Sequence, residues 1–363
     1  MPRIGVIGGG IAGLTVALRR SRAGDEVVVF EASSHWGGQL RTELSGEFVI
    51  EHGAEGFVAR SESVPALAAA VGVDDHLIDQ RVTHSYAFDG SKLAPLAPGE
   101  AARMLGFQVA PDELGRGIRS FLRGMQELSD ALELTVSQLC ELRQDSVVQT
   151  IREGSHGLRV GFEQGREEAV DALVVATDAA TAARLLEPLA GDDARALGLL
   201  QTTSSATVSL AYRREAIDHP LDGSGFIVPN ASPRDPRACT FSSSKLPGRA
   251  PVGHVLLRMF FRPAAEELAT TPDAEWVARA ERCVGAALPV RAPPEQGWVS
   301  AWPNALPVFD GQHRRRVQVL ESTLGRHRAV LAGAAFHGSG IDAAVRSAET
   351  AARALGDGSA SGG

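Results

Sequence analysis

The feature that most constrains this chain is a glycine-rich segment, GGGIAG at residues 8–13, which follows the apolar run RIGVI at residues 3–7. Gly8 permits a tight turn from strand to helix, Gly10 lets the backbone approach a pyrophosphate, and Gly13 lets the helix pack closely against the strand. We expect a helix over Ile11–Arg22, whose N-terminal amides and dipole favour an anion. The spacing predicts a βαβ unit that binds a dinucleotide.

An acidic residue stands where such a unit binds ribose. Glu26–Phe30 is a short apolar run of β-branched composition, typical of a buried strand, and Glu31 follows it directly. A carboxylate there accepts hydrogen bonds from ribose hydroxyls and repels a 2′-phosphate. A glycine turn that serves packing alone is the alternative, and the strand, helix and acid together argue against it.

A second glycine pair, Gly37-Gly38, and an arginine, Arg41, come shortly after Glu31. They would cover the pyrophosphate from the other side, whereas an ordinary surface turn is the alternative. Nicotinamide-binding folds usually continue directly into another βα unit. An acid followed by a glycine pair and an arginine resembles the FAD-binding amine oxidase superfamily, and this resemblance implies FAD as the cofactor.

Composition excludes several classes of function. The 363 residues are 44% hydrophobic and carry a formal charge of −8, with Lys92 and Lys245 as the lysines, so we expect no nucleic-acid partner. Cys140, Cys239 and Cys283 are far apart and lack the spacing of a metal site or a disulfide framework, so we expect no metal.

The start of the chain and its apolar runs bear on location. No charged-then-apolar leader precedes the first predicted strand, and no apolar run reaches the roughly 18 residues that a bilayer crossing needs. We therefore expect a cytoplasmic protein with at most peripheral contact with the inner face of the membrane.

Segments farther along narrow the resemblance to the protoporphyrinogen oxidase family, over most of the chain. They are Gly53–Phe57, Gly223–Pro229, Phe241–Pro251, Trp302–Pro307 and the C-terminal LAGAAFHGSGI at 331–341. The last segment reads as a buried strand that enters a glycine-rich helix start. True amine oxidases usually have Glu where Ala334 stands, so the C-terminal segment favours the protoporphyrinogen oxidase branch.

The resemblance implies a set of cofactor neighbours and a smaller set of substrate neighbours. The cofactor neighbours are Gly8, Gly9, Gly10, Ile11, Ala12, Gly13, Glu31, Ala32, Gly38, Gln39, Arg41, Gly53, Ala54, Glu55, Gly56, Val148, Ala176, Trp302, Gly333, Ala334, Ser339, Gly340 and Ile341. The substrate neighbours are Arg81, His84, Ser224, Gly225, Ile227 and Met259. No side-chain acid or base is demanded, because the cofactor carries the redox chemistry.

Three departures from the family pattern concern the substrate site. The segment from Leu96 to Arg119 is too short for the helical membrane-binding domain that the family usually inserts there. Ser224 replaces an aromatic residue that stacks on the tetrapyrrole, and Phe260-Phe261 replaces a glycine pair. His84 aligns with the arginine that binds a propionate in relatives, which leaves Arg81 as a substitute.

The resemblance also implies the architecture, an α/β fold with a discontinuous Rossmann-like FAD-binding domain, an α+β substrate domain and a shortened insertion. We expect the FAD domain at 1–85, 131–190 and 306–356, a helical connection at 86–130, the substrate domain at 191–305 and a disordered tail at 357–363. Ala206–Tyr212 alternates like a strand with one wet face.

The resemblance implies oxygen-dependent oxidation of protoporphyrinogen IX to protoporphyrin IX, with hydride transfer to flavin N5 and release of hydrogen peroxide. Several alternatives stay open. The substrate could be coproporphyrinogen, and the enzyme could be an FAD amine oxidase or a polyene desaturase. The chain could also be a non-catalytic flavin- or porphyrin-binding protein, and it could form a homodimer. We interpret His313–Arg316 as a solvated turn in preference to a propionate site, and His337 as structural in preference to a proton carrier.

Overall fold

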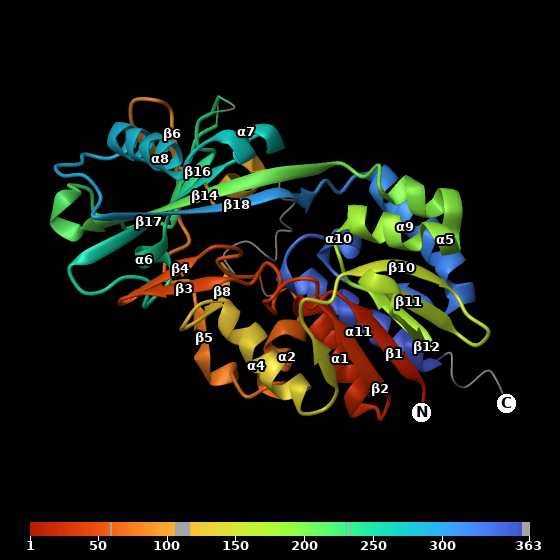
Figure 1. The fold of residues 1–363 in the computed structure, drawn as a ribbon. Coiled ribbons are helices and arrows are strands. Elements are labelled where there is room, and N and C mark those ends of the chain that lie inside the picture. Colours follow the sequence, from red (N-terminus) through yellow and green to blue (C-terminus); the bar gives the residue numbers. More distant parts are fainter. Residues whose placement is uncertain (59, 106–116, 230, 233, 358–363) are drawn as a thin grey trace.

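The computed structural model describes residues 1–363 except 59, 106–116, 230, 233 and 358–363. Two sheets dominate it, one in the part that contains both termini and one at the far side (Figure 1). The predicted disordered tail lies outside the described residues apart from Asp357, which ends the last helix. The expected fold class, with a Rossmann-like part and an α+β part, is confirmed.

The first sheet has five parallel strands in the order β19-β13-β1-β2-β9. Their bounds are β1 Arg3–Ile7, β2 Glu26–Phe30, β9 Glu141–Arg143, β13 Ala172–Val175 and β19 Ala329–Leu331. The central strands read as continuous apolar runs because both faces of the sheet are covered.

Each face of this sheet has its own hydrophobic core. One face packs on the helices α1 Ile11–Arg22, α2 Ser63–Ala70, α4 Gln126–Ser137 and α11 Ile341–Asp357. The other packs on α5 Ala179–Leu197, α9 Gly311–Leu324 and a three-stranded sheet of β10 Val148–Glu153, β11 Leu158–Phe162 and β12 Glu167–Val170. The predicted bounds of α1 and β2 are confirmed, and α5 contains a kink at Gly191.

The second sheet has seven strands in the order β18-β14-β17-β16-β15-β6-β7, antiparallel except where β15 pairs with β6. Their bounds are β6 Tyr86–Phe88, β7 Leu93–Pro95, β14 Thr202–Arg213, β15 Gly225–Ile227, β16 Ala238–Phe241, β17 His254–Phe261 and β18 Gln296–Pro307. The helices α7 Ala265–Thr270 and α8 Asp273–Ala287 cover one face, where they share a core with the strands. The long strands β14 and β18 reach from this sheet toward α5 and α9 (Figure 1).

Shorter elements complete the fold, and the hairpin of β3 and β4 together with β8 and α6 lies at the junction between the two sheets. They are the hairpin β3 Thr42–Ser45 and β4 Phe48–Glu51, the pair β5 Leu77–Asp79 and β8 Arg119–Phe121, and the short helices α3 Glu100–Met104, α6 Ser242–Lys245 and α10 Ala334–His337. Single 3-10 turns occur at Asp74–His76, Glu163–Gly165, Arg214–Ala216 and Gly325–His327.

Three sequence expectations about these regions need correction. Residues Ala206–Tyr212 are all buried, so the predicted wet face of this strand is wrong, because the junction elements cover the face that α7 and α8 leave open. Residues 86–95 form β6 and β7 of the seven-stranded sheet, whereas a helical connection was expected, and α3 is the short helix that follows them. His313 is buried within α9 and does not belong to a solvated turn.

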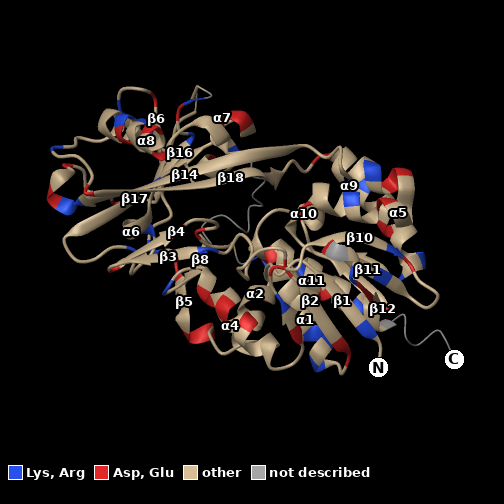
Figure 2. Ribbon diagram, in the orientation of Figure 1, with Lys and Arg blue, Asp and Glu red and all other residues tan. Residues whose placement is uncertain are grey.

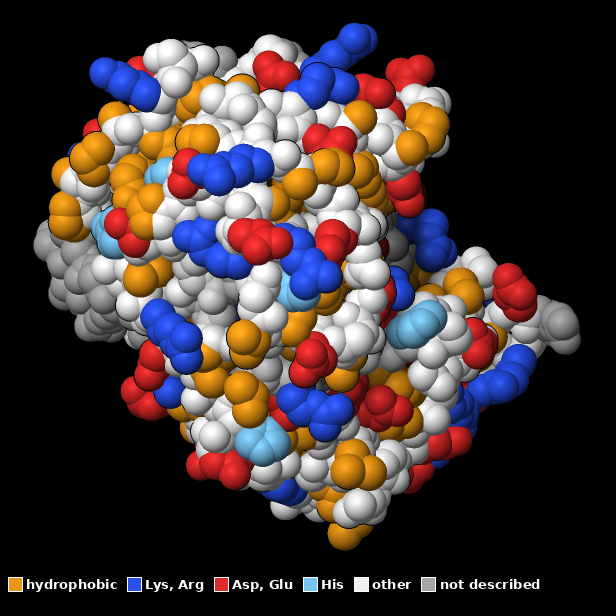
Figure 3. All heavy atoms as spheres, turned by 90° about the vertical axis from the view of Figure 1, so that its left-hand side faces the viewer, with side chains coloured by type: hydrophobic (Ala, Val, Ile, Leu, Met, Phe, Trp, Pro, Cys, Tyr) orange, Lys and Arg blue, Asp and Glu red, His pale blue; other side chains and the backbone are white. Residues whose placement is uncertain are grey.

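Charged residues of both signs are distributed along the chain (Figure 2), and they alternate over the face shown in Figure 3. Among the helices that the structure describes, none combines the length and apolar composition that crossing a membrane requires.

Candidate cofactor and substrate site

The turn from β1 to α1 has the close packing that its glycines allow. Gly8 has a φ of +105°, and a Cβ on it would lie 2.7 Å from the carbonyl oxygen of Ala176. A Cβ on Gly13 would lie 1.9 Å from the oxygen of Gly8, so any larger residue would push the helix away from the strand. The turn therefore holds the start of α1 directly beyond the sheet edge, as the dinucleotide prediction requires.

The second glycine pair lies against this turn. Gly37 donates a backbone hydrogen bond to the oxygen of Gly9 over 2.9 Å, and it forms a bridge with Gly10. A Cβ on Gly38 would lie 3.2 Å from the Cα of Gly10, which caps α1 without any side-chain hydrogen bond. The two glycine turns thus form a narrow cradle at the N-terminal amides of Ile11 and Ala12, a place suited to phosphate.

Glu31 lies beside the cradle with part of its hydrogen-bonding capacity in use. Its Oε2 accepts from the Gly9 amide at 2.6 Å, and its Oε1 accepts from the Ser33 amide and hydroxyl at 2.8 Å each. A carboxylate has about four acceptor positions, so room remains for a ribose hydroxyl. Ala32 follows Glu31, and the buried Val148 belongs to the same core as Phe30.

Arg41 and Gln39 continue from the cradle toward the seven-stranded sheet. The side-chain Nε2 of Gln39 donates to the oxygen of Ala305 at 3.3 Å, and a Cβ on Gly53 would lie 1.7 Å from the backbone oxygen of Gln39. Arg41 is exposed, and its guanidinium forms no ion pair within the described residues. Its guanidinium is thus available, as the sequence prediction for this arginine requires.

The C-terminal glycine segment comes back to the first helix. A Cβ on Gly333 would lie 3.5 Å from the Cβ of Ala12, so the two predicted cofactor motifs meet although they come from opposite ends of the sequence. Ala334 begins α10, and Ser339 and Gly340 lead into α11 at Ile341. His337 bonds Ser347 and Glu321 at 2.6 and 2.8 Å, which agrees with its structural interpretation.

The turn after β4 carries Gly53 to Gly56 between the two sheets. Ala54 packs against the first core, and a Cβ on Gly56 would lie 2.5 Å from the oxygen of Arg119. The Gly53 oxygen accepts a 2.6 Å hydrogen bond from the guanidinium of Arg258 on β17. The turn is therefore fixed by the seven-stranded sheet.

Glu55 points its carboxylate at that sheet. It accepts from Ser242 Oγ at 2.7 Å and from Lys245 Nζ at 2.8 Å, and it is 9% exposed. Burial alone would raise the pKa of Glu55, but the charges of Lys245 and Arg258 lower it to about 2. The side chain is thus an ionised anchor between the two parts of the molecule, and the Glu55 backbone oxygen accepts a 2.9 Å hydrogen bond from Ser120 Oγ.

Sequence reasoning missed Lys245 and Arg258. The signal for Lys245 was present, because a chain with two lysines places one of them beside the segment that resembles the family. Arg258 could be found only through its position in an otherwise apolar strand, where a buried charge requires a partner.

A second buried carboxylate, Glu51, lies at the end of β4. It is 3% exposed and accepts from the Met125 amide at 2.7 Å and from Thr42 Oγ1 at 2.8 Å. Burial raises the pKa of Glu51 to about 7, although Arg249 lies 3.8 Å away and opposes the change.

Strand register shows which residues of the seven-stranded sheet face the junction. Directly paired residues share a face, and one row runs through Ala87, Ile227, Ala238, Phe260, Thr207 and Ser300. The next row on the same face contains Gly225, Thr240, Arg258, Ser209 and Trp298. Arg258 bonds Gly53, so this face points toward the cofactor motifs. We call it the junction face.

The register corrects one predicted substrate residue. Met259 lies between the two rows and therefore on the opposite face, where it is fully buried in the core that contains Trp276 of α8. The sequence could not distinguish the two faces of a strand that is apolar on both. Phe260 takes its place on the junction face, with the Arg258 guanidinium 5.0 Å from its ring centre.

The other predicted substrate residues lie around β15. Ser224 donates from its backbone and hydroxyl to the oxygen of His84, at 2.8 and 3.0 Å. Gly225 and Ile227 belong to the two rows of the junction face. Arg81 is exposed, and its amide donates to the oxygen of Lys245 at 2.9 Å. The structure thus brings Ser224 and His84 together and places Arg81 beside the Glu55 anchor.

Trp302, a predicted cofactor neighbour, follows the same alternation on β18. Its indole Nε1 donates to the oxygen of His52 at 2.7 Å, directly before the Gly53 turn. The part of the chain that the structure describes contains no group of three or more His, Cys, Asp or Glu residues arranged to hold a metal.

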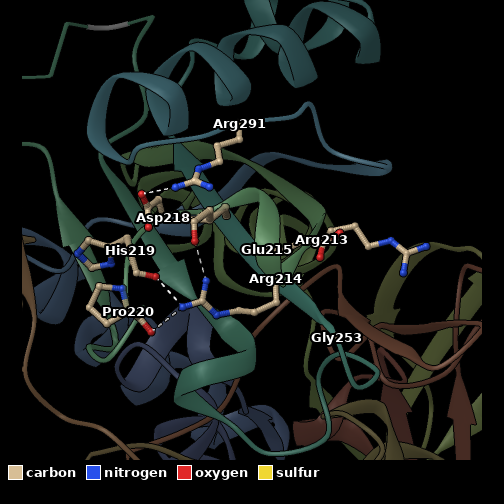
Figure 4. A pocket seen from close by; sticks show the side chains of 9 residues that line it. Arg213, Arg214, Glu215, Asp218, His219, Pro220, Gly253 and Arg291 are labelled. Carbon is tan, nitrogen blue, oxygen red and sulfur yellow. Dashed lines mark hydrogen bonds and ion pairs between the residues drawn. The ribbon is translucent and has the colours of Figure 1, made fainter.

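A cavity of about 590 Å³ lies beyond the end of β14 and is lined by charged residues (Figure 4). Its arginines already have partners: Arg291 pairs with Asp218 at 2.6 Å, and Arg214 donates to the oxygens of Ile217 and His219 at 2.7 Å each. None of the predicted cofactor or substrate residues lines it, so we do not place the reaction there.

Comparison with known families decides the interpretation of this geometry. The model of the family described as flavin containing amine oxidoreductase matches residues 100–356, and that of the NAD(P)-binding Rossmann-like domain matches residues 6–71. The chain belongs to the flavin-containing amine oxidoreductase family. This flavin oxidoreductase is an FAD enzyme, and FAD fits the observed residues, because an open glycine cradle, a ribose acceptor and a free arginine follow one another along one edge.

Relatives of this flavin oxidoreductase align over between 60% and 96% of it. It is 26% identical to "Coproporphyrinogen III oxidase" of Propionibacterium freudenreichii subsp. freudenreichii over 96% of this chain and 89% of that protein. It is 27% identical to "Protoporphyrinogen oxidase, chloroplastic" of Oryza sativa subsp. japonica over 60% of this chain and 42% of that protein. A crystal structure from Exiguobacterium sp. 255-15, provisionally named a protoporphyrinogen oxidase, has the same fold, with a TM-score of 0.83, 20% identity and 98% coverage of both chains.

Proposed function

We propose that this flavin oxidoreductase oxidises coproporphyrinogen III to coproporphyrin III in tetrapyrrole biosynthesis, with oxygen as electron acceptor and hydrogen peroxide as by-product. The observation that carries the proposal is the extent of the likeness to proteins named coproporphyrinogen III oxidase. These span 96% of this chain in the Propionibacterium protein and 93% in the Bacillus subtilis protein. Protoporphyrinogen IX, which the sequence resemblance implies, is the second candidate, and the rice relative favours it.

The junction face supports a flat macrocyclic substrate. Ile227 and Phe260 are its large apolar residues in the first row, with Ala238 between them. Phe260 is half-buried and can contact a ring system, whereas Ile227 and Ala238 are buried. Neighbouring strands are about 4.8 Å apart, so this row is broad enough for a tetrapyrrole. Aromatic rings stack on such systems in offset or edge-on geometry.

Exposed cations favour a substrate with several carboxylates. Arg81 lies beside the Glu55 anchor, and Arg262 continues the alternation of the junction face directly after β17. Both are exposed, and neither guanidinium forms an ion pair within the described residues. Arginine binds carboxylates in a bidentate manner, so these two are candidates for substrate propionates. Coproporphyrinogen carries more propionates than protoporphyrinogen and would gain more from them.

The chain's own residues bind and orient the reactants. The cradle of Gly10 and Gly38 with Arg41 would hold the pyrophosphate, Glu31 the ribose, and the turns at Gly53 and Gly333 the remainder of the cofactor. Bound FAD supplies the hydride acceptor that oxygen regenerates. The Glu55–Lys245 pair fixes the junction face relative to the cofactor motifs, because it joins the two parts through buried charges. Close placement of reacting groups in this way lowers the entropic part of the barrier.

The test begins with purified protein whose flavin absorbance has been recorded. Anaerobically prepared coproporphyrinogen III or protoporphyrinogen IX is added, and oxygen is then admitted. Porphyrin fluorescence reports the product, and an enzyme-free sample corrects for spontaneous oxidation. We expect faster oxidation of coproporphyrinogen III. Faster oxidation of protoporphyrinogen IX would replace the substrate, and bound flavin without acceleration of either would overturn the function in favour of an amine oxidase, a desaturase or a carrier.

A further inference from the structure

Three polar side chains form a chain of hydrogen bonds from the junction face to the outer surface. Ser300 Oγ lies 2.7 Å from His52 Nδ1, and His52 Nε2 lies 2.9 Å from Glu43 Oε2. Ser300 is 7% exposed, whereas the side chains of His52 and Glu43 are 23% and 44% exposed. The three groups therefore lead in two steps from a buried position to solvent.

The chemistry of the three groups gives the chain a direction. A carboxylate only accepts hydrogen bonds, so His52 carries its proton on Nε2 and donates it to Glu43. Nδ1 is then the acceptor, and the Ser300 hydroxyl donates to it. Both bonds thus point outward, and the free lone pairs of the Ser300 oxygen are left to accept a proton from the junction face.

The inner end of the chain lies at the reaction site proposed above. Ser300 is in the same row as Ile227 and Phe260, and His52 precedes Gly53 of the cofactor turn. The bond from Trp302 Nε1 to the His52 oxygen fixes the backbone of the histidine. On the other side of the turn, Arg258 on β17 bonds the oxygen of Gly53, the residue that follows His52.

We propose that Ser300, His52 and Glu43 form a proton relay between the substrate and solvent. The proposal rests on the proposed function, which creates the need for one. In each two-electron step one C–H bond breaks, and its electron pair leaves with the hydrogen as hydride to the bound cofactor. The macrocycle, now a cation, loses a proton from a second C–H or N–H bond and keeps the electron pair of that second bond.

The relay accounts for the path of this proton. The proton passes to Ser300 Oγ as the serine proton moves to His52 Nδ1, the Nε2 proton moves to Glu43, and Glu43 releases it to water. Conversion of oxygen and the hydride to hydrogen peroxide takes up one proton, for which the same groups offer the inward path. Histidine suits this role because it exchanges protons near neutral pH.

A purely structural role is the alternative, and the chain contains a matched control for it. His254 bonds Glu295 at 3.1 Å and packs edge-on against Phe48 of the same hairpin, with ring centres 5.7 Å apart. This histidine also joins β17 to a carboxylate, but its Nδ1 lies 3.3 Å from the backbone oxygen of Val252, where His52 has a serine. His254→Ala therefore removes a similar structural contact without interrupting a relay.

The experiment compares His52→Ala, Ser300→Ala and His254→Ala with the parent enzyme. Oxidation of the porphyrinogen is measured with and without added imidazole, and each variant's melting temperature and affinity for the porphyrin product are measured separately. We expect the oxidation rate to fall at least about tenfold in His52→Ala and also to fall in Ser300→Ala. Imidazole should restore much of the loss in His52→Ala, while product affinity and melting temperature stay close to those of His254→Ala.

The outcomes separate the relay from the function on which it rests. A parent enzyme that oxidises porphyrinogen, together with a His52→Ala variant that is equally fast, overturns the relay alone. A slow His52→Ala variant that imidazole does not rescue, and that has lost product affinity, shows a structural role and also overturns it. A parent enzyme that oxidises no porphyrinogen overturns the function and the relay together.

Discussion

Replacement of Glu55 by glutamine tests whether a buried ion pair joins the two parts of the molecule. The folded pKa of Glu55 is about 2, against an ordinary value of 4.5. This difference corresponds to about 3 kcal/mol of folding free energy that Glu55→Gln should remove at pH 7. Solvent screens this interaction little, because the carboxylate is buried and bonds both Ser242 and Lys245.

The sign of the pH dependence follows from the lowered pKa. The contribution of Glu55 to folding stability is complete above about pH 4.5 and is lost as the pH falls through about 2. The reason is that the unfolded chain binds the proton at a higher pH than the folded protein does. We therefore expect the stability difference between the parent protein and Glu55→Gln to be constant from pH 7 to about 5 and to shrink below that range.

Urea unfolding, followed by tryptophan fluorescence at a series of pH values, measures this difference. Glu187→Gln is the control, because Glu187 pairs with Arg195 at 2.7 Å on the surface, where both side chains are about half exposed. Such pairs contribute at most about 1 kcal/mol. A Glu55→Gln variant that is as stable as the parent at pH 7, or whose stability deficit stays the same down to pH 3, would contradict a stabilising buried ion pair.

Three further predictions concern the junction and the cradle. Glu51→Gln should match the parent in stability below about pH 4.5 and exceed it by up to about 3 kcal/mol above pH 7. The reason is that the raised pKa of Glu51 makes its ionised form destabilise the fold. Urea unfolding at pH 4.5 and pH 8 measures the difference. Gly13→Ala should lose bound flavin, because its Cβ would lie 1.9 Å from the Gly8 oxygen, whereas Gly311→Ala, with open space around its Cβ, should retain it; flavin absorbance per protein is the measurement. Phe260→Ala should weaken porphyrin binding by about tenfold, as expected for a lost aromatic contact. Phe261→Leu changes the core on the other face of the strand, so it should lower the melting temperature and leave porphyrin binding unchanged. Equal effects of the two changes on binding would contradict the assignment of faces.

The nucleotide-binding part could be predicted from the sequence because its signals are local. The glycines at 8, 10 and 13 impose backbone geometry by themselves, and the bounds of α1 and β2 followed from a helix start and an apolar run. The C-terminal motif at 331–341 was recognisable for the same reason, and the structure places it beside Ala12.

The substrate side could be predicted less well because its decisive relations are between distant strands. Whether Met259 or Phe260 faces the junction depends on the register of β17 with β14 and β16, which a strand that is apolar on both faces does not reveal. The contacts of Lys245 with Glu55 and of Ser300 with His52 join residues 190 and 248 positions apart. Such pairs become visible only in the folded chain.

The position of the last residues of the chain has a consequence for synthesis in the cell. The strand β19 completes one edge of the five-stranded sheet, and α11 packs over α1, whose N-terminal end forms the cradle. A ribosome therefore has to synthesise the chain through α11 before the nucleotide-binding part can finish folding. Capture of the flavin then follows synthesis of this helix, and a protein truncated before residue 329 would lack both the edge strand and the helix needed to keep the cofactor.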